Sequence, residues 1–117
     1  MGTFKARIGV SDGNGGPTEW VEALVDTGAT WTVLPHSMLE RIGIYPDTKM
    51  TFTYADGREV LLPVGEARLT VEGKATFNPV VFGEENRYLL GATSLQVFGL
   101  IADTTNHRLT PAPVLLL

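Results

Sequence analysis

The sequence contains no cysteine, and its only two histidines, His36 and His107, stand far apart. Disulfide bonds and thiolate metal sites are therefore excluded, and no grouped zinc ligands are present, so we expect no metal and no cofactor. No stretch approaches the length of a transmembrane helix, and residues 1–10 lack the apolar centre of a signal peptide. We therefore expect a cytoplasmic protein that makes no membrane contact.

Charge is also sparse, because nine lysines and arginines accompany thirteen acidic residues and give a formal charge of −4. No basic cluster is present, so a nucleic-acid partner is not expected. No serine lies in a Gly-x-Ser-x-Gly turn, and the glycines at 13–16 are not followed by the Lys-Ser or Lys-Thr of a phosphate loop. Asp12 and Asn14 resemble a calcium loop, but Ala23 occupies the position that needs an acidic residue.

The 117 residues predict one domain, residues 1–117, and its 13 glycines and 7 prolines between short apolar runs indicate an all-β fold. We expect strands at 3–10, 19–25, 32–35, 66–71, 74–82, 100–103 and 108–110. A hairpin over 49–62 turns at Asp56-Gly57, and one short helix covers 36–43.

One stretch of the sequence combines a predicted strand and a turn with a candidate catalytic residue. The apolar run 23–25 is followed at once by Asp26, Thr27 and Gly28, and a second β-branched run covers 32–35. Gly28 permits a backbone turn that a residue with a Cβ would resist. Asp26 would lie at the end of a buried strand, where a charged residue is rare unless it has a function.

The string Asp26-Thr27-Gly28-Ala29, with its apolar flanks, resembles the active-site loop of retropepsin-like (clan AA) aspartic proteases. Leu89-Leu90-Gly91 resembles the family's strand that crosses behind this loop, and a short helix follows it. Thr93 or Ser94 can cap that helix and Gly99 can end it. The two motifs stand in the family's order and at about its spacing. The chain is identified as a member of this family, of bacterial or archaeal cellular origin.

The resemblance implies a closed all-β acid-protease barrel with one or two short helices and one lobe per chain. It makes the hairpin a flap that closes over a peptide or unfolded protein substrate, whereas the residues alone favour an ordinary surface hairpin. The flap residues would be Tyr54, Ala55, Asp56, Gly57 and Arg58, and the loop would be supported by Leu89, Leu90 and Gly91.

Hydrolysis by this chemistry needs two carboxylates that share one proton. Asp103 is the internal alternative, but Thr105 stands where the motif has glycine, and too little chain follows to build a second lobe. We therefore expect a homodimer in which Asp26 of each copy contributes to one site. The resemblance implies that Thr27 bonds across the two-fold axis and that the terminal residues Val114, Leu115, Leu116 and Leu117 hold the dimer.

Thr30 and Ala92 occupy positions where retroviral members often have an acidic residue and an arginine joined as an ion pair. Trp31 is bulkier than expected, and it could pack in the core, at the dimer interface or in a substrate subsite. A second interpretation of the whole chain stays open, since the same fold could serve as a non-catalytic dimerisation or peptide-binding module.

Overall fold

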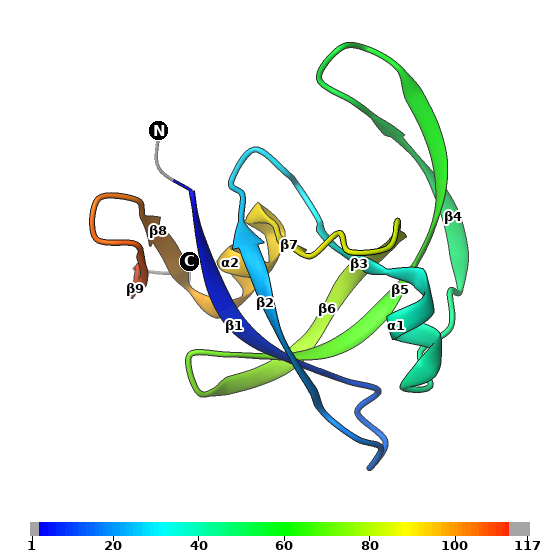
Figure 1. Ribbon diagram of the computed structural model, residues 1–117, viewed down its shortest axis with the longest axis horizontal. Helices are drawn as coiled ribbons and strands as arrows, with labels where there is room; N and C mark the ends of the chain where they lie inside the picture. Colours follow the sequence, from blue (N-terminus) through cyan, green and yellow to red (C-terminus); the bar gives the residue numbers. More distant parts are fainter. Residues whose placement is uncertain (1–2, 113–117) are drawn as a thin grey trace, which may run out of the picture.

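A computed structural model describes residues 3–112, so the expected dimer contacts of Val114 to Leu117 lie outside the described residues. Nine strands and two short helices make up this part of the chain (Figure 1). In chain order they are β1 (Phe4–Ser11), β2 (Glu19–Val25), β3 (Thr32–Pro35), α1 (His36–Arg41), β4 (Thr48–Thr53), β5 (Glu59–Val71), β6 (Lys74–Gly83), β7 (Leu89–Leu90), α2 (Ala92–Phe98), β8 (Leu100–Asp103) and β9 (Arg108–Pro111).

Seven of the strands form one sheet in the order β1-β2-β7-β3-β6-β5-β4. β1 also pairs with β5 through Gly9, Val10 and Ser11, so the pairing runs around the lobe and returns to β1. The apolar side chains that face inward are buried, among them Ile8, Leu34 and Leu69. β8 and β9 form a separate two-stranded sheet. The lobe is mostly β, as the distribution of glycine and proline predicts.

The long strand β5 is the main difference from the predicted strands. The sequence predicts a hairpin that ends at residue 62 and a separate strand at 66–71, with Pro63 and Gly65 between them. In the structure one strand passes through both residues and pairs first with β4 and then with β6. A Cβ at Gly65 would lie 3.1 Å from the backbone oxygen of Tyr45, so this glycine permits a close crossing and does not mark a turn.

The start of α2 corrects a second expectation. Neither Thr93 nor Ser94 caps this helix, because its N-cap is Gly91 and no side chain bonds the cap. Ser94 is instead fully buried and bonded to Thr32. Gly99 ends the helix in the left-handed conformation, with φ of 66°, as expected. Neither helix within residues 3–112 is long and apolar enough to cross a membrane.

Candidate active site

The two-residue strand β7 positions the loop that carries Asp26. Leu89 and Leu90 pair in parallel with Leu24 and Val25 of β2, and Leu89 also pairs with Val33 of β3. β7 therefore lies between the strand that enters the loop and the strand that leaves it. The Asp26 amide donates to the Leu90 carbonyl at 3.1 Å, which ties the start of the loop to the sheet. Leu89 and Leu90 thus lie where the sequence motif requires a support.

The loop itself folds back on the Asp26 carboxylate. The Gly28 amide donates to Asp26 Oδ1 at 2.9 Å, and the Ala29 amide donates to the Asp26 carbonyl at 3.1 Å. A Cβ at Gly28 would lie 3.2 Å from Asp26 Oδ1, so glycine leaves room for this short contact. Thr27 and Gly28 are exposed, and Asp26 and Ala29 are half-buried. The side chain of Asp26 is therefore held in one orientation at the surface of the lobe.

A buried polar cluster fixes the other end of the loop. Thr32 Oγ1 and Ser94 Oγ lie 2.6 Å apart, and the Gly91 amide donates to Thr32 Oγ1 at 3.1 Å. A Cβ at Gly91 would lie 2.5 Å from the carbonyl carbon of Trp31. Gly91 is required here because the two backbones touch, and its φ of −94° is ordinary.

Two backbone bonds join the loop to α2 beside Thr30 and Ala92, the positions where the family that the sequence resembles often has an ion pair. The Ala92 amide donates to the Ala29 carbonyl and the Thr93 amide donates to the Thr30 carbonyl, each at 2.8 Å. Thr30 and Ala92 carry no charge, so no ionised group is left unpaired between these segments. The loop and the start of α2 are joined here by main-chain hydrogen bonds.

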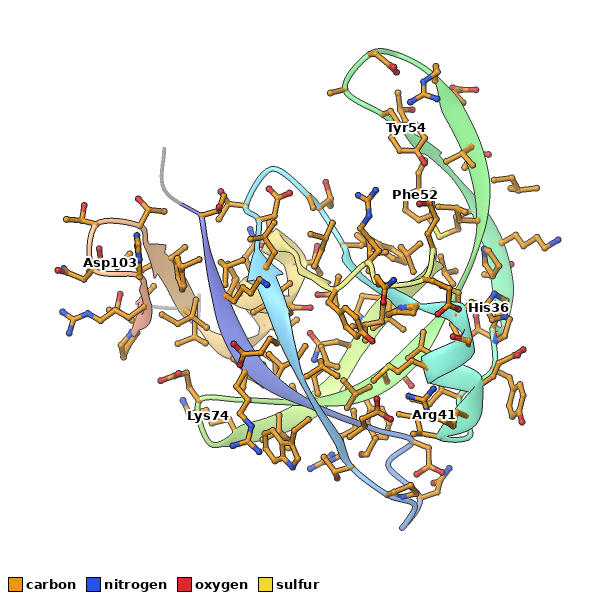
Figure 2. The ribbon with its side chains drawn as sticks, in the orientation of Figure 1. His36, Arg41, Phe52, Tyr54, Lys74 and Asp103 are labelled. Carbon is orange, nitrogen blue, oxygen red and sulfur yellow. The ribbon has the colours of Figure 1, made fainter. Side chains whose placement is uncertain are left out.

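A groove of about 500 Å³ opens beside this loop. It is bounded on one side by the Asp26 loop and on the other by the β4–β5 hairpin, whose Phe52 and Tyr54 lie on its concave side (Figure 2). The lining is mostly apolar. Its residues are Asp26, Gly28, Ala29, Thr30, Trp31, Val33, Phe52, Thr53, Tyr54, Ala55, Val60, Leu62, Val81, Gly83, Glu84, Arg87 and Leu89. Trp31 is half-buried in this wall. It therefore does not lie in the buried core, which was the first of the three places considered for it.

Several lining residues are not identified by the sequence motifs. Phe52, Val60 and Leu62 could have been found from the alternation along the hairpin strands, which places every second residue on one face. Glu84 and Arg87 come from a polar loop with no sequence signal for a site. They are brought to the groove because β6 and β7 flank the loop between them.

The five predicted flap residues lie at the hairpin tip and fall into two groups. Tyr54 and Ala55 line the groove, whereas Asp56, Gly57 and Arg58 build the turn. The Tyr54 amide donates to the Arg58 carbonyl at 2.8 Å, and Gly57 has a φ of 91°. The Arg58 amide and its Nε both donate to the Asp56 carboxylate, which lowers the pKa of Asp56. The Arg58 guanidinium lies 4.7 Å from the centre of the Tyr54 ring.

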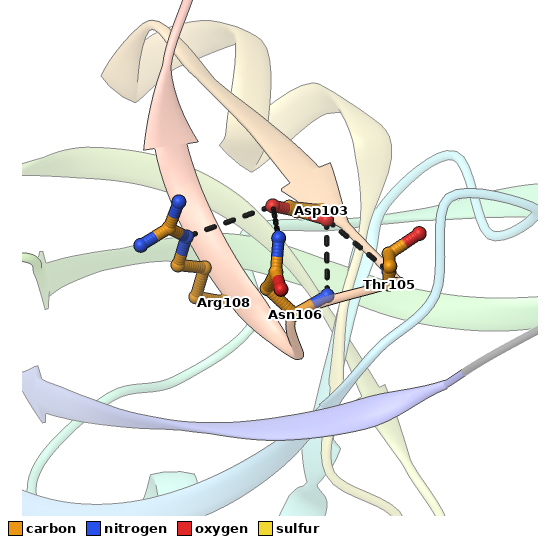
Figure 3. Close-up of polar contacts among 4 residues, drawn as sticks. All are labelled: Asp103, Thr105, Asn106 and Arg108. Carbon is orange, nitrogen blue, oxygen red and sulfur yellow. Dashed lines mark hydrogen bonds and ion pairs between the residues drawn. The ribbon is translucent and has the colours of Figure 1, made fainter.

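Asp103, the internal alternative to a second Asp26, has a structural role in the β8–β9 turn (Figure 3). Its Oδ2 accepts from Asn106 Nδ2, and its Oδ1 accepts the amides of Thr105 and Asn106. The Asn106 side chain, its amide and the Thr105 amide, with nearby Arg108, lower the pKa of Asp103. Asp103 does not line the groove. Within residues 3–112, the acidic residues that line it are Asp26 and Glu84.

This geometry agrees with two comparisons with known proteins. Residues 14–97, well over half of the chain, match the model of the family described as gag-polyprotein putative aspartyl protease. The chain belongs to this family. The solution structure of Simian Foamy Virus (mac) protease matches with a TM-score of 0.59 and 21% sequence identity, over 80% of this chain and 93% of that one. This likeness shows the fold alone. No curated protein sequence matches the chain.

The family and the fold confirm the coarser predictions from the sequence. The chain has the mostly β, single-lobed fold of a retroviral protease and belongs to an aspartyl protease family. The matched segment contains the Asp26 loop, the hairpin and the β7 motif.

Proposed function

We propose that this chain is a homodimeric aspartic endopeptidase in which the Asp26 carboxylates of two copies act on one peptide bond. The observation that carries the proposal is the position of Asp26, on a loop held by β7 at the edge of a largely apolar groove. Membership of an aspartyl protease family supports the same activity. The return of strand pairing from β5 to β1 supports the closed barrel expected for this fold.

The reaction needs one carboxylate to accept a proton from water while the other, protonated, donates to the carbonyl oxygen of the scissile bond. Two carboxylates a few ångströms apart cannot easily both ionise, so the pair titrates as a unit. Thr27 and Gly28 are exposed beside Asp26 in a single chain. We propose that a second copy covers them, that Thr27 bonds across the two-fold axis, and that Val114 to Leu117 add to the interface.

The hairpin would act as the flap in this proposal. An extended peptide in the groove would pair its backbone with a strand edge and place its side chains against the apolar lining. Tyr54 and Ala55 would face the peptide, while Asp56, Gly57 and Arg58 would keep the shape of the tip. A cytoplasmic location and a bacterial or archaeal origin stay predictions from the sequence.

The test is cleavage of an unfolded protein at mildly acidic pH. We expect the wild-type chain to cleave it, and the Asp26→Asn variant to lose activity by about a hundred-fold or more, because a general acid–base group is removed. Asp47→Asn is the matched control, since Asp47 lies outside the groove lining and should leave cleavage unchanged. Retained cleavage in the Asp26→Asn variant would contradict the proposed mechanism.

A second measurement separates the enzyme from the binding module. Pepstatin, a peptide-like transition-state mimic, should bind the wild-type dimer, and sedimentation should show a dimer that weakens when the chain is truncated before Val114. A dimer that binds peptides without Asp26-dependent cleavage would establish the non-catalytic module. An active chain that stays monomeric at every concentration would rule out the shared site.

A further inference from the structure

The β4–β5 hairpin is anchored at its base, where β5 continues into its pairing with β6, and few contacts beyond that base fix its angle to the lobe. Among residues 3–112, β4 pairs with β5 alone, and every β4 residue is exposed except the half-buried Phe52. Figure 1 shows the hairpin extending beyond the lobe. A segment with little buried surface opens at low free-energy cost, so a single contact can determine where it rests.

Phe52 makes such a contact with Trp31. The two ring centroids lie 5.6 Å apart with an interplanar angle of 71°, the edge-to-face arrangement that aromatic pairs prefer. Both rings line the groove that contains Asp26. The contact therefore joins the hairpin to the segment between the Asp26 loop and β3, within one chain.

Trp31 is the fixed partner of the pair. Its carbonyl carbon is packed against the Gly91 backbone, where no room for a Cβ exists. The carbonyl of its neighbour Thr30 accepts the Thr93 amide, and its other neighbour, Thr32, is bonded to Ser94. Because the backbone is held on both sides of Trp31, a change in this contact moves the hairpin and leaves the loop in place.

The other aromatic contact in the hairpin cannot serve this purpose. Arg58 lies over the Tyr54 ring, but both residues belong to the same turn. Their contact stabilises the tip and does not relate it to the lobe. The Trp31–Phe52 pair, by contrast, spans two separate segments.

We propose that Trp31 is a positioning residue, which holds the hairpin over Asp26 through Phe52 before substrate binds. The effect of this role on catalysis rests on the proposed protease function. The position of the hairpin can be measured whether or not the chain is a protease. Removal of either ring should let the hairpin sample open positions. The affinity for pepstatin should then fall by about two- to ten-fold, which is the factor that corresponds to the free energy contributed by one aromatic pair.

The absence of native cysteine allows a direct measurement. Spin labels at Glu59→Cys beside the tip, outside the groove lining, and at Gln96→Cys on α2 report their separation by pulsed electron resonance, with labelled chains diluted in excess unlabelled protein. Both labelled positions are exposed. We expect one narrow distance distribution for the parent. Trp31→Ala and Phe52→Ala should broaden it equally, and the double variant should broaden it no further, because they remove the same contact.

Two further variants complete the design. Phe77→Ala makes the same chemical change at an exposed ring outside the groove and should leave the distribution narrow. Trp31→Phe retains an aromatic edge, so it should keep the narrow distribution and most of the pepstatin affinity. This variant also tests the proposal if Trp31→Ala does not fold, since a broad distribution with a folded Trp31→Phe chain argues against an aromatic contact.

The outcomes separate this inference from the proposed function. An unchanged distribution in Phe52→Ala overturns the positioning role, whether or not the chain cleaves peptides. A broadened distribution in a chain without Asp26-dependent cleavage supports the contact and contradicts only the protease. In an active enzyme the loss should be in KM more than in kcat, because substrate binding closes the hairpin again.

Discussion

Thr32 and Ser94 are 62 residues apart in the sequence and share a buried hydroxyl–hydroxyl hydrogen bond of 2.6 Å. With the Gly91 amide, which donates to the same threonine oxygen, they join the end of the Asp26 loop to α2. Both hydroxyls are fully buried, so neither can exchange this bond for water. The loop that carries the proposed catalytic group is therefore supported from inside the lobe.

The first prediction concerns this cluster. Thr32→Val keeps the shape but leaves the Gly91 amide and the Ser94 hydroxyl without their partner, so we expect a loss of about 1–3 kcal/mol in unfolding free energy. Ser94→Ala should cost less, about 1 kcal/mol, because Thr32 keeps its bond to Gly91. Urea unfolding at one fixed protein concentration measures both. Exposed Thr51→Val is the control, and a Thr32→Val chain as stable as this control would contradict the assignment.

The second prediction concerns Gly91. An added methyl would meet the Trp31 carbonyl carbon at 2.5 Å and its oxygen at 2.6 Å, so Gly91→Ala should destabilise the lobe by about 1–3 kcal/mol. Gly15→Ala has open space around its Cβ but an unfavourable φ of 87°, so it shows the cost of backbone strain, which Gly91 with its φ of −94° does not carry. Denaturant unfolding compares the two. A Gly91→Ala chain as stable as the wild type would contradict the close backbone contact, because alanine is otherwise unstrained at the Gly91 φ of −94°.

The third prediction tests whether each site needs two chains. When wild-type and Asp26→Asn chains are mixed in equal amounts and allowed to exchange, about a quarter of the dimers contain two intact carboxylates. Cleavage should fall to about a quarter of the wild-type rate at the same total protein, whereas a site within one chain predicts about a half. Initial rates across a series of mixing ratios distinguish a quadratic from a linear dependence.

The fourth prediction follows from the lowered pKa of Asp103. Its carboxylate accepts hydrogen bonds from Asn106 and Thr105 in the folded chain, so ionisation favours folding. This contribution is complete above the ordinary aspartate pKa, about 3.9, and disappears as pH falls through the lower folded value. Asp103→Ala should therefore lower Tm at neutral pH, and the difference from wild type should shrink in strong acid.

Asp47→Ala serves as the control for that experiment, because Asp47 is exposed and its bond to the Val64 carbonyl comes from the backbone amide, which alanine keeps. Thermal unfolding followed by circular dichroism at a series of pH values gives both curves. A constant difference between wild type and Asp103→Ala at every pH would contradict a role for the ionised carboxylate.

The local elements could be predicted because each depends on neighbouring residues. The strand predicted at 19–25, with its apolar run before Asp26, has the observed bounds of β2, and Asp56-Gly57 predicts the turn between β4 and β5. The helix cap at 93 or 94 was wrong for a tertiary reason. The serine has a hydroxyl that could cap the helix. In the folded chain this hydroxyl bonds instead to a threonine on a distant strand, because the fold brings the two together.

The sequence by itself determined the family and the order of the two motifs, and it predicts Asp26 as the carboxylate of the proposed reaction, because these depend on residue identities within short motifs. Only the tertiary structure decided that Trp31 faces the groove and meets Phe52, that Glu84 and Arg87 line its wall, and that Asp103 stabilises a turn. Side-chain surroundings such as these depend on which strands become neighbours. That pairing is made by contacts between segments far apart in the chain, which local spacing does not encode.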